Sequence, residues 1–144
     1  MTESRAPEVE DFNGKVIAEF RAKGGRVGGP FQGSDILLLH HTGARSGRER
    51  VNPLAYQWVG DSLAVFASKG GAPRNPDWLH NLLAHPDAVV EVGTRTVRVR
   101  ARLAQPAERD VICSRQKQRN PAFAQHEVKA APRKIPVVVL DPVK

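Results

Sequence analysis

Short apolar runs separated by tight turns recur along most of this chain, and this pattern limits the fold more than any other feature. Six runs are predicted to be strands, at residues 35–42, 50–59, 63–68, 88–92, 96–103 and 135–140. Gly60-Asp61 and Gly93-Thr94 are typical of two-residue hairpin turns. Strands joined mostly by hairpins predict a mainly β (α+β) fold, a small antiparallel barrel or roll of about six strands with peripheral helices.

Three segments are predicted to be helices, at residues 7–23, 75–84 and 106–119. The apolar stripe of the first helix could cover the open end of the barrel or lie on a membrane surface, and its lack of a basic face favours packing on the core. Asn75 is the predicted cap of the second helix, with Pro76 at its first position. The chain is predicted to be one domain, 1–144, in which residues 1–34 form an N-terminal helix and a glycine-rich link.

Cysteine and histidine usage narrows the possible chemistry. The single cysteine, Cys113, excludes an internal disulfide and a cysteine-based metal cluster, and it is predicted to be a small apolar residue on a helix. No two of the five histidines have metal-binding spacing together with a third ligand, so no metal site is predicted. The polar N-terminus and the absence of an apolar run of about 20 residues lead us to expect a cytoplasmic protein.

The charge balance favours an anionic partner. Twenty-two lysines and arginines against 15 aspartates and glutamates give a net charge of +7, which suits nucleic acid, an acidic membrane surface or an anionic small molecule. Arg98, Arg100 and Arg102 alternate with apolar residues and predict a strand with one buried and one basic face. That face lacks the exposed aromatic residues that stack on single-stranded nucleic acid, so nucleic-acid binding is not expected.

Residues 67–78 give the strongest functional signal. The segment leaves an apolar strand, passes through Ser68, Lys69, Gly70 and Gly71, and enters a helix. A glycine-rich turn between a strand and a helix exposes backbone N–H groups, here beside a lysine, and this suits an anionic or carbonyl-rich ligand. An ordinary strand-to-helix loop is the alternative interpretation.

The turn at residues 42–50 is a second candidate. It carries Arg45 and Arg50, the Ser46 hydroxyl and backbone donors near Gly47, all of which can bind phosphate. A hairpin turn with a solvated basic rim explains the same residues equally well.

Trp78 and Asn81 are a third candidate, because they are three residues apart and share one face of a predicted helix. An indole beside a carboxamide suits a planar heterocycle with polar edges. The alternative is a core tryptophan beside a surface asparagine.

Together these motifs resemble the deazaflavin-dependent nitroreductase and quinone reductase family, which are split β-barrel oxidoreductases that use coenzyme F-420. The most specific block is Ala-Ser-Lys-Gly-Gly at residues 67–71, followed by Asn-Pro-x-Trp-x-x-Asn-Leu at residues 75–82. Residues 37–47 and 133–140 extend the resemblance over nearly the whole chain. The resemblance implies a split β-barrel and a deazaflavin (coenzyme F-420) as the cofactor, with no metal.

The resemblance also implies roles for individual residues. The phosphate and anionic tail of the cofactor would be held by Arg45, Ser46, Gly47 and Arg50. Asn52, Pro53 and Leu54 would line the deazaflavin ring, mostly through their backbones. The polar edge of the ring would meet backbone donors of Ala67, Ser68, Lys69 and Gly70. Trp78 and Asn81 would close the site.

By the same resemblance the chain is an enzyme that transfers a hydride from reduced deazaflavin to a quinone, an enone or a nitroaromatic. Ser68 is expected to stabilise negative charge on the acceptor oxygen. Phe123 and His126 replace tyrosines of the family and are expected to line the substrate pocket, where His126 either donates a proton or only packs.

The resemblance also leaves some properties open. The expected partner is a small-molecule electron acceptor, the chain is a monomer or a homodimer, and peripheral contact with the inner face of the cell membrane is one expectation. The alternative function is a non-catalytic binder of a deazaflavin, a flavin or another hydrophobic ligand.

Overall fold

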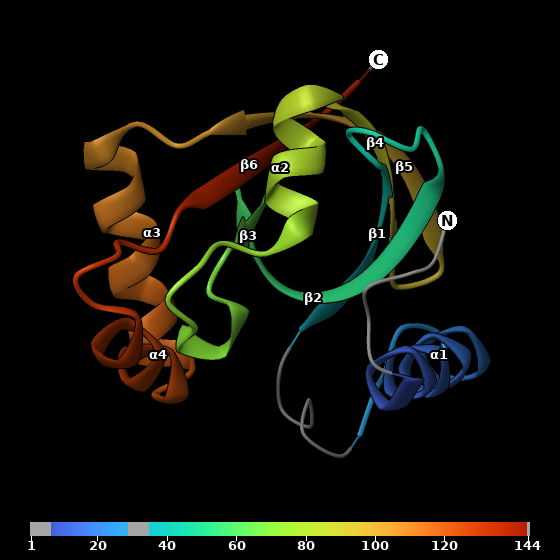
Figure 1. The fold of residues 1–144 in the computed structure, drawn as a ribbon, viewed down its shortest axis with the longest axis horizontal. Coiled ribbons are helices and arrows are strands. Elements are labelled where there is room, and N and C mark those ends of the chain that lie inside the picture. The colour runs from blue at the N-terminus through green and yellow to red at the C-terminus, as the bar shows by residue number, and fades with distance from the viewer. Residues whose placement is uncertain (1–6, 29–34, 144) are drawn as a thin grey trace.

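The structure, a computed structural model, describes residues 7–28 and 35–143, and of residues 7–12 the backbone alone. In these residues, antiparallel strands close into a barrel in the order β1-β2-β3-β6-β5-β4 (Figure 1). The strands are β1 (Ile36–Thr42), β2 (Glu49–Val59), β3 (Ser62–Phe66), β4 (Asp87–Val92), β5 (Arg95–Leu103) and β6 (Val137–Pro142). The predicted barrel and its six strands are therefore confirmed.

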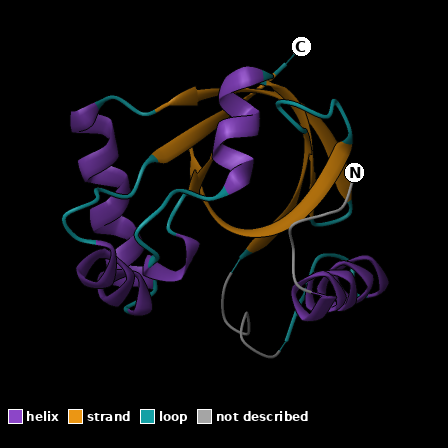
Figure 2. Cartoon of the chain, in the orientation of Figure 1, coloured by secondary structure: helices purple, strands orange, loops and turns teal. Residues whose placement is uncertain are grey.

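Helices surround the barrel on several sides (Figure 2). They are α1 (Pro7–Ala22), the 3-10 turn η2 (Lys69–Gly71), α2 (Asp77–Ala84), α3 (Pro106–Arg119) and α4 (Ala122–Ala130). The three predicted helices are present, whereas α4 and η2 were not predicted. Within α4 only Phe123 and Ala130 are buried, and two buried residues seven positions apart give too weak a periodicity to be recognised.

Alternate side chains of each strand point into the barrel and form its main core. Leu37 and Leu39 of β1 belong to this core. Figure 1 shows α2 lying across one mouth of the barrel, and its residues Trp78, Leu79 and Leu82 are buried in the same core. The helix therefore closes that mouth of the barrel.

The intervening side chains point outward and contact the remaining helices. Ile36 and Leu38 of β1 pack against Phe20 of α1. The apolar stripe of α1 thus covers the side wall of the barrel, which corrects the suggestion that it covers the open end. The physical reason is that the outer face of β1 is itself apolar and needs a cover.

The outer faces of β3 and β6 are covered by α3 and α4. Phe66 of β3 and Phe123 of α4 meet edge to face, with ring centroids 5.1 Å apart. Cys113 of α3 is buried in the same cluster, and burial raises the pKa of its thiol. The thiol therefore behaves as the small apolar residue that the sequence predicted.

The start of α2 differs from the predicted one. Pro76, with extended backbone, occupies the cap position, and no side chain caps the helix there. The Asn75 side chain instead accepts a hydrogen bond from Arg133, at 2.7 Å from Nη1 to Oδ1. The predicted cap role of Asn75 is therefore wrong, because a stronger charged donor uses its oxygen.

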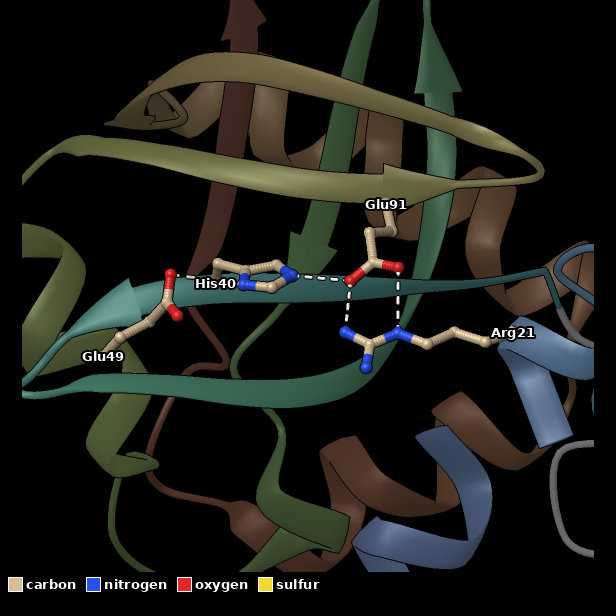
Figure 3. Close-up of polar contacts among 4 residues, drawn as sticks. All are labelled: Arg21, His40, Glu49 and Glu91. Atoms are coloured by element: carbon tan, nitrogen blue, oxygen red, sulfur yellow. Dashed lines mark hydrogen bonds and ion pairs between the residues drawn. The ribbon is translucent and has the colours of Figure 1, made fainter. Parts of the chain in front are cut away.

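A polar cluster of four residues joins α1 to the outer wall of the barrel (Figure 3). Arg21 of α1 donates two hydrogen bonds to Glu91 of β4, at 2.7 and 3.1 Å. His40 of β1 lies between two carboxylates, with Nε2 2.6 Å from Glu91 and Nδ1 3.3 Å from Glu49. The hydrogen bond from Arg21, helped by His40, holds the pKa of Glu91 below its usual value.

Glu91→Gln is expected to lower the free energy of unfolding by about 1 kcal/mol at neutral pH, because it removes the charge that Arg21 and His40 face. The lowered folded-state pKa means that the Glu91 carboxylate stabilises the protein above the pKa of the unfolded chain. This contribution is lost as the pH falls through the folded-state pKa. Urea unfolding at a series of pH values should therefore show wild type and variant converging in acid.

Asp87→Asn is the matched control, since Asp87 also pairs with an arginine, Arg100, but its side chain is 79% exposed. This change should alter the free energy of unfolding by less than the change at Glu91. Equal losses of unfolding free energy in the two variants would contradict the stabilising role of Glu91. So would a difference between wild type and Glu91→Gln that does not shrink in acid.

Candidate functional site

The hydrogen-bond ladder between β2 and β3 stops part-way along β2. Residues 49–55 of β2 pair with β1, whereas only residues 56–59 pair with β3. Among the described strands, the first half of β2 therefore has one open edge. Tyr56 N–H donates to the Asp35 carbonyl oxygen, on the β1 side of β2. Backbone nitrogens of a strand alternate between its two edges, so the nitrogen of Pro53, three residues earlier, faces the open edge. This nitrogen carries no hydrogen and leaves no donor unpaired there.

The segment that follows β3 is held by Arg133. Its guanidinium donates to the carbonyl oxygens of Ala67 (3.0 Å), Ser68 (2.8 Å) and Ala72 (2.7 and 3.1 Å), in addition to the Asn75 side chain. The rigid planar fork of an arginine suits several acceptors held in one plane. Arg133 therefore fixes the path of the chain from β3 to α2.

The turn η2 has an unusual backbone and a close neighbour. Lys69 has φ +49° and Gly71 has φ +86°. A Cβ on Gly71 would come within 3.0 Å of the His126 carbonyl oxygen on α4, so a side chain has no room there. The N–H groups of Ser68 and Lys69 make no hydrogen bond with the described residues. The N–H groups of Ser68 and Lys69 are thus available to a ligand at the start of a turn that Arg133 holds in place.

The β1–β2 turn presents a compact basic loop. Gly43 N–H donates to Arg48 and Gly47 N–H donates to Gly43, which has no room for a side chain because a Cβ would collide with the Ser46 hydroxyl. The Ser46 hydroxyl oxygen accepts from Arg48 N–H at 3.2 Å. The Arg45 side chain is exposed and makes no ion pair with the described residues. The loop therefore has a fixed shape and an available cation.

A buried polar network joins this loop to α2 and to β2. Ala44 N–H donates to Asn81 Oδ1 at 2.9 Å, and Asn81 Nδ2 lies 3.1 Å from His41 Nδ1. His41 Nε2 lies 2.7 Å from Asn52 Oδ1. Asn81 is 8% exposed and His41 is 2% exposed. Asn81 is therefore not a surface residue, because the network holds it between the helix and the two strands.

Most of the predicted site residues lie at one end of the barrel, which α2 covers. The β1–β2 turn, the first half of β2 and the end of β3 meet there because adjacent strands run antiparallel. This end carries Arg45, Ser46, Gly47, Arg50, Asn52, Pro53, Leu54, Ala67, Ser68, Lys69, Gly70 and Asn81. The structure thus brings these residues to one region, and their contacts with a ligand stay predictions.

Three predicted residues have other surroundings. Trp78 is 5% exposed in the barrel core, and Phe123 is 4% exposed between α4 and the outer face of β3. Neither ring presents a free face to a ligand in this structure. His126 is half-buried on α4, and its backbone oxygen lies against η2. The substrate and cofactor contacts predicted for these side chains stay predictions.

Two residues at this end were missed from the sequence, His41 and Arg133. His41 is one of two adjacent histidines in β1, and strand alternation could have separated their roles, since His40 points outward and His41 points to the α2 side. Arg133 lies in a predicted connection, where no pattern indicates which carbonyl groups it reaches. The role of Arg133 depends on contacts with residues that are distant in the sequence.

The part of the chain that the structure describes holds neither a membrane-spanning helix nor a cluster of metal ligands. None of the helices is both long and apolar enough to cross a membrane. The described histidine, cysteine, aspartate and glutamate side chains form no group of three or more arranged to hold a metal ion.

Comparison with known proteins gives consistent matches. A family model described as F420H(2)-dependent quinone reductase matches residues 14–142. An F420H(2)-dependent quinone reductase of Mycobacterium tuberculosis is 43% identical over 94 residues, which are 65% of this chain and 63% of that protein. The matched segment thus spans less than two thirds of that relative's length.

Solved structures also resemble this chain. An F420-H2 dependent reductase has a TM-score of 0.68 and 33% identity, covering 74% of this chain and 93% of its own. A structure described as a domain-swapped dimer has a TM-score of 0.70 and 26% identity, covering 93% and 99%. The expected split-barrel fold is confirmed by these neighbours, and the match over residues 14–142 shows that this chain belongs to the F420H(2)-dependent quinone reductase family.

Proposed function

We propose that this chain is an F-420H2-dependent oxidoreductase that transfers a hydride from reduced deazaflavin to a quinone-like acceptor. Family membership supports the cofactor class and the reaction type. The single observation that carries the proposal for this chain is the open edge of β2, which lies at the same barrel end as the braced turn η2. A planar ring fits such an arrangement, because its faces can pack while its polar edge meets backbone donors.

The residues at this end fit the chemistry of the cofactor. A deazaflavin has carbonyl oxygens on its ring, and the N–H groups of Ser68 and Lys69 are donors without partners among the described residues. The anionic tail needs cations, and Arg45 and Lys69 are exposed and make no described ion pair. The net charge of +7 adds a favourable long-range field. Asn52, Pro53 and Leu54 would then lie along the ring.

The cofactor supplies the hydride, and the protein supplies orientation and electrostatics. Arg133 holds the turn that carries Ser68, so the donors there need little reorganisation when a ligand binds. Ser68 is half-buried, and its hydroxyl is proposed to donate to an acceptor oxygen that becomes negative. His126, which is half-buried on α4, is proposed as the proton donor.

The acceptor and the assembly belong to the same proposal. A quinone is favoured because the family and the curated relative carry that activity in their names, and an enone or a nitroaromatic is the alternative acceptor. One similar structure is described as a domain-swapped dimer, which supports a homodimer. A location in the cytoplasm, with peripheral contact at the inner face of the cell membrane, completes the proposal, because quinones partition into membranes.

The proposal is tested by titrating the protein with F-420 while following cofactor fluorescence, and then by mixing protein, reduced F-420 and menadione. Micromolar or tighter binding and protein-dependent oxidation of the reduced cofactor are expected. No detectable binding would refute the function. Tight binding with no turnover across a panel of quinones, enones and nitroaromatics would instead favour a non-catalytic binder.

Lys69→Ala and Arg45→Ala are each expected to raise the dissociation constant for F-420 by about ten-fold, because each removes a charged partner of the anionic cofactor. The effect at Arg45 should fall more steeply with added salt, since its side chain lies on the exposed rim. Arg98→Ala is the matched control, because it removes an equal charge from the outer face of β5. Equal effects of all three variants would contradict the site.

Arg133→Lys is expected to lower the free energy of unfolding by about 2 kcal/mol and to weaken F-420 binding, because a lysine cannot replace the planar fork. Arg109→Lys is the control, since Arg109 also donates to a backbone oxygen, that of Ile135, at 2.9 Å. The control should lose stability but keep the affinity for F-420. Thermal unfolding and the fluorescence titration measure both effects. Equal loss of affinity in the two variants would contradict the role of Arg133 in holding the binding turn.

A further inference from the structure

One backbone group sets the direction of each hydrogen bond along the series Ala44, Asn81, His41 and Asn52. Ala44 N–H can only donate, so the Asn81 atom that faces it is the oxygen Oδ1. The Asn81 NH2 group then faces His41, and because it too can only donate, His41 Nδ1 must accept. His41 is therefore neutral with its proton on Nε2, which donates to Asn52 Oδ1.

The network also fixes the orientation of the Asn52 side chain. Its oxygen is occupied by His41, so its NH2 group is left to face other partners. No hydrogen bond of the described residues uses the Asn52 amide nitrogen. Asn52 is half-buried and lies two residues from Leu54, on the same face of β2 and along its open edge.

We propose that His41 is a positioning residue, which presents the Asn52 amide as a hydrogen-bond donor to an acceptor oxygen on the ring of the bound cofactor. This inference rests on the proposed function, which puts the deazaflavin ring along β2. His41 does not touch the cofactor and acts through Asn52. The ring edge that meets Asn52 must therefore carry an acceptor, such as a carbonyl oxygen.

The orientation is locked because each alternative creates a conflict in a buried place. A proton on His41 Nδ1 would face the Asn81 NH2 group, donor against donor. Rotating the Asn81 amide to relieve that conflict would put its NH2 group against Ala44 N–H. With Asn81 and His41 both almost fully buried, water cannot relieve either conflict. The Asn52 donor is thus prepared before any ligand arrives.

Two substitutions separate the halves of the network. His41→Gln places an NH2 group near the position of Nε2, so it can keep the hydrogen bond to Asn52 and lose the one from Asn81. His41→Asn places an oxygen near the position of Nδ1, so it can keep the bond from Asn81 and lose the one to Asn52. Each variant keeps one bond, and both are expected to lose similar thermal stability.

The affinity for F-420 should nevertheless differ between the variants. His41→Asn is expected to raise the dissociation constant about ten-fold, whereas His41→Gln should stay within about three-fold of wild type. In NMR spectra, the Asn52 side-chain NH2 signals should shift on F-420 binding in wild type and in His41→Gln, but not in His41→Asn. Affinity losses that follow thermal stability alone, with no difference between the variants, would overturn the positioning role.

A measurement on the wild-type protein without ligand covers the case in which a variant does not fold. The ¹⁵N chemical shifts of the His41 ring should show an unprotonated Nδ1 and a protonated Nε2. A proton on Nδ1 would overturn the inference. Wild type that fails to bind F-420 would refute the proposed function, whereas normal wild-type binding with two equally affected variants would refute the role of His41 alone.

Discussion

The two-residue alternation of the β-strands is the constraint on which the rest of this structure depends. Adjacent residues of β1, His40 and His41, point to opposite sides of the barrel wall. The outer side receives α1, through apolar packing and through the ion pairs of Arg21 and Glu91. The inner side receives α2, which closes the mouth of the barrel. The outer face of β1 thus attaches α1, and its inner face contributes to the candidate site. A one-residue slip in strand pairing would turn each side chain of β1 to the opposite face.

The candidate site depends on two features, the unpaired edge of β2 and the turn η2, and hydrogen bonds from neighbouring side chains hold both in place. The ladder of β2 and β3 begins only at Tyr56, so residues 49–55 of β2 leave an edge that a planar ligand can approach. Arg133 holds the carbonyl groups of the neighbouring turn. Ala44 N–H orients the Asn81 amide, and His41 orients the Asn52 amide. For hydride transfer, the cofactor must be held at a defined angle and distance from the acceptor. In the proposed complex, fixed donors at the ring edge meet this requirement without a conformational change.

The sequence predicted the barrel, its six strands and three of its helices, because these depend on local alternation and turn residues. It also predicted the family, through the block at residues 67–82. It did not predict α4, whose two buried residues give no clear period, or the roles of Arg133 and His41, which depend on distant partners. Asn75 was misassigned as a cap for the same reason, since Arg133 is 58 residues away in the chain. Trp78 and Phe123 appear as candidate ligand contacts in the sequence, whereas both rings lie in cores.

The central claim is that F-420 lies between the open edge of β2 and the turn η2. Titrating ¹⁵N-labelled protein with F-420 and mapping the amide shifts tests it most directly. We expect the largest changes at residues 51–54 and 68–71 and in the side chains of Asn52 and Asn81. We expect little change near Gly25 and Gly93, where a separate surface cavity of about 300 Å³ lies beside α1. Shifts concentrated around that cavity, with residues 51–54 and 68–71 unaffected, would contradict the account.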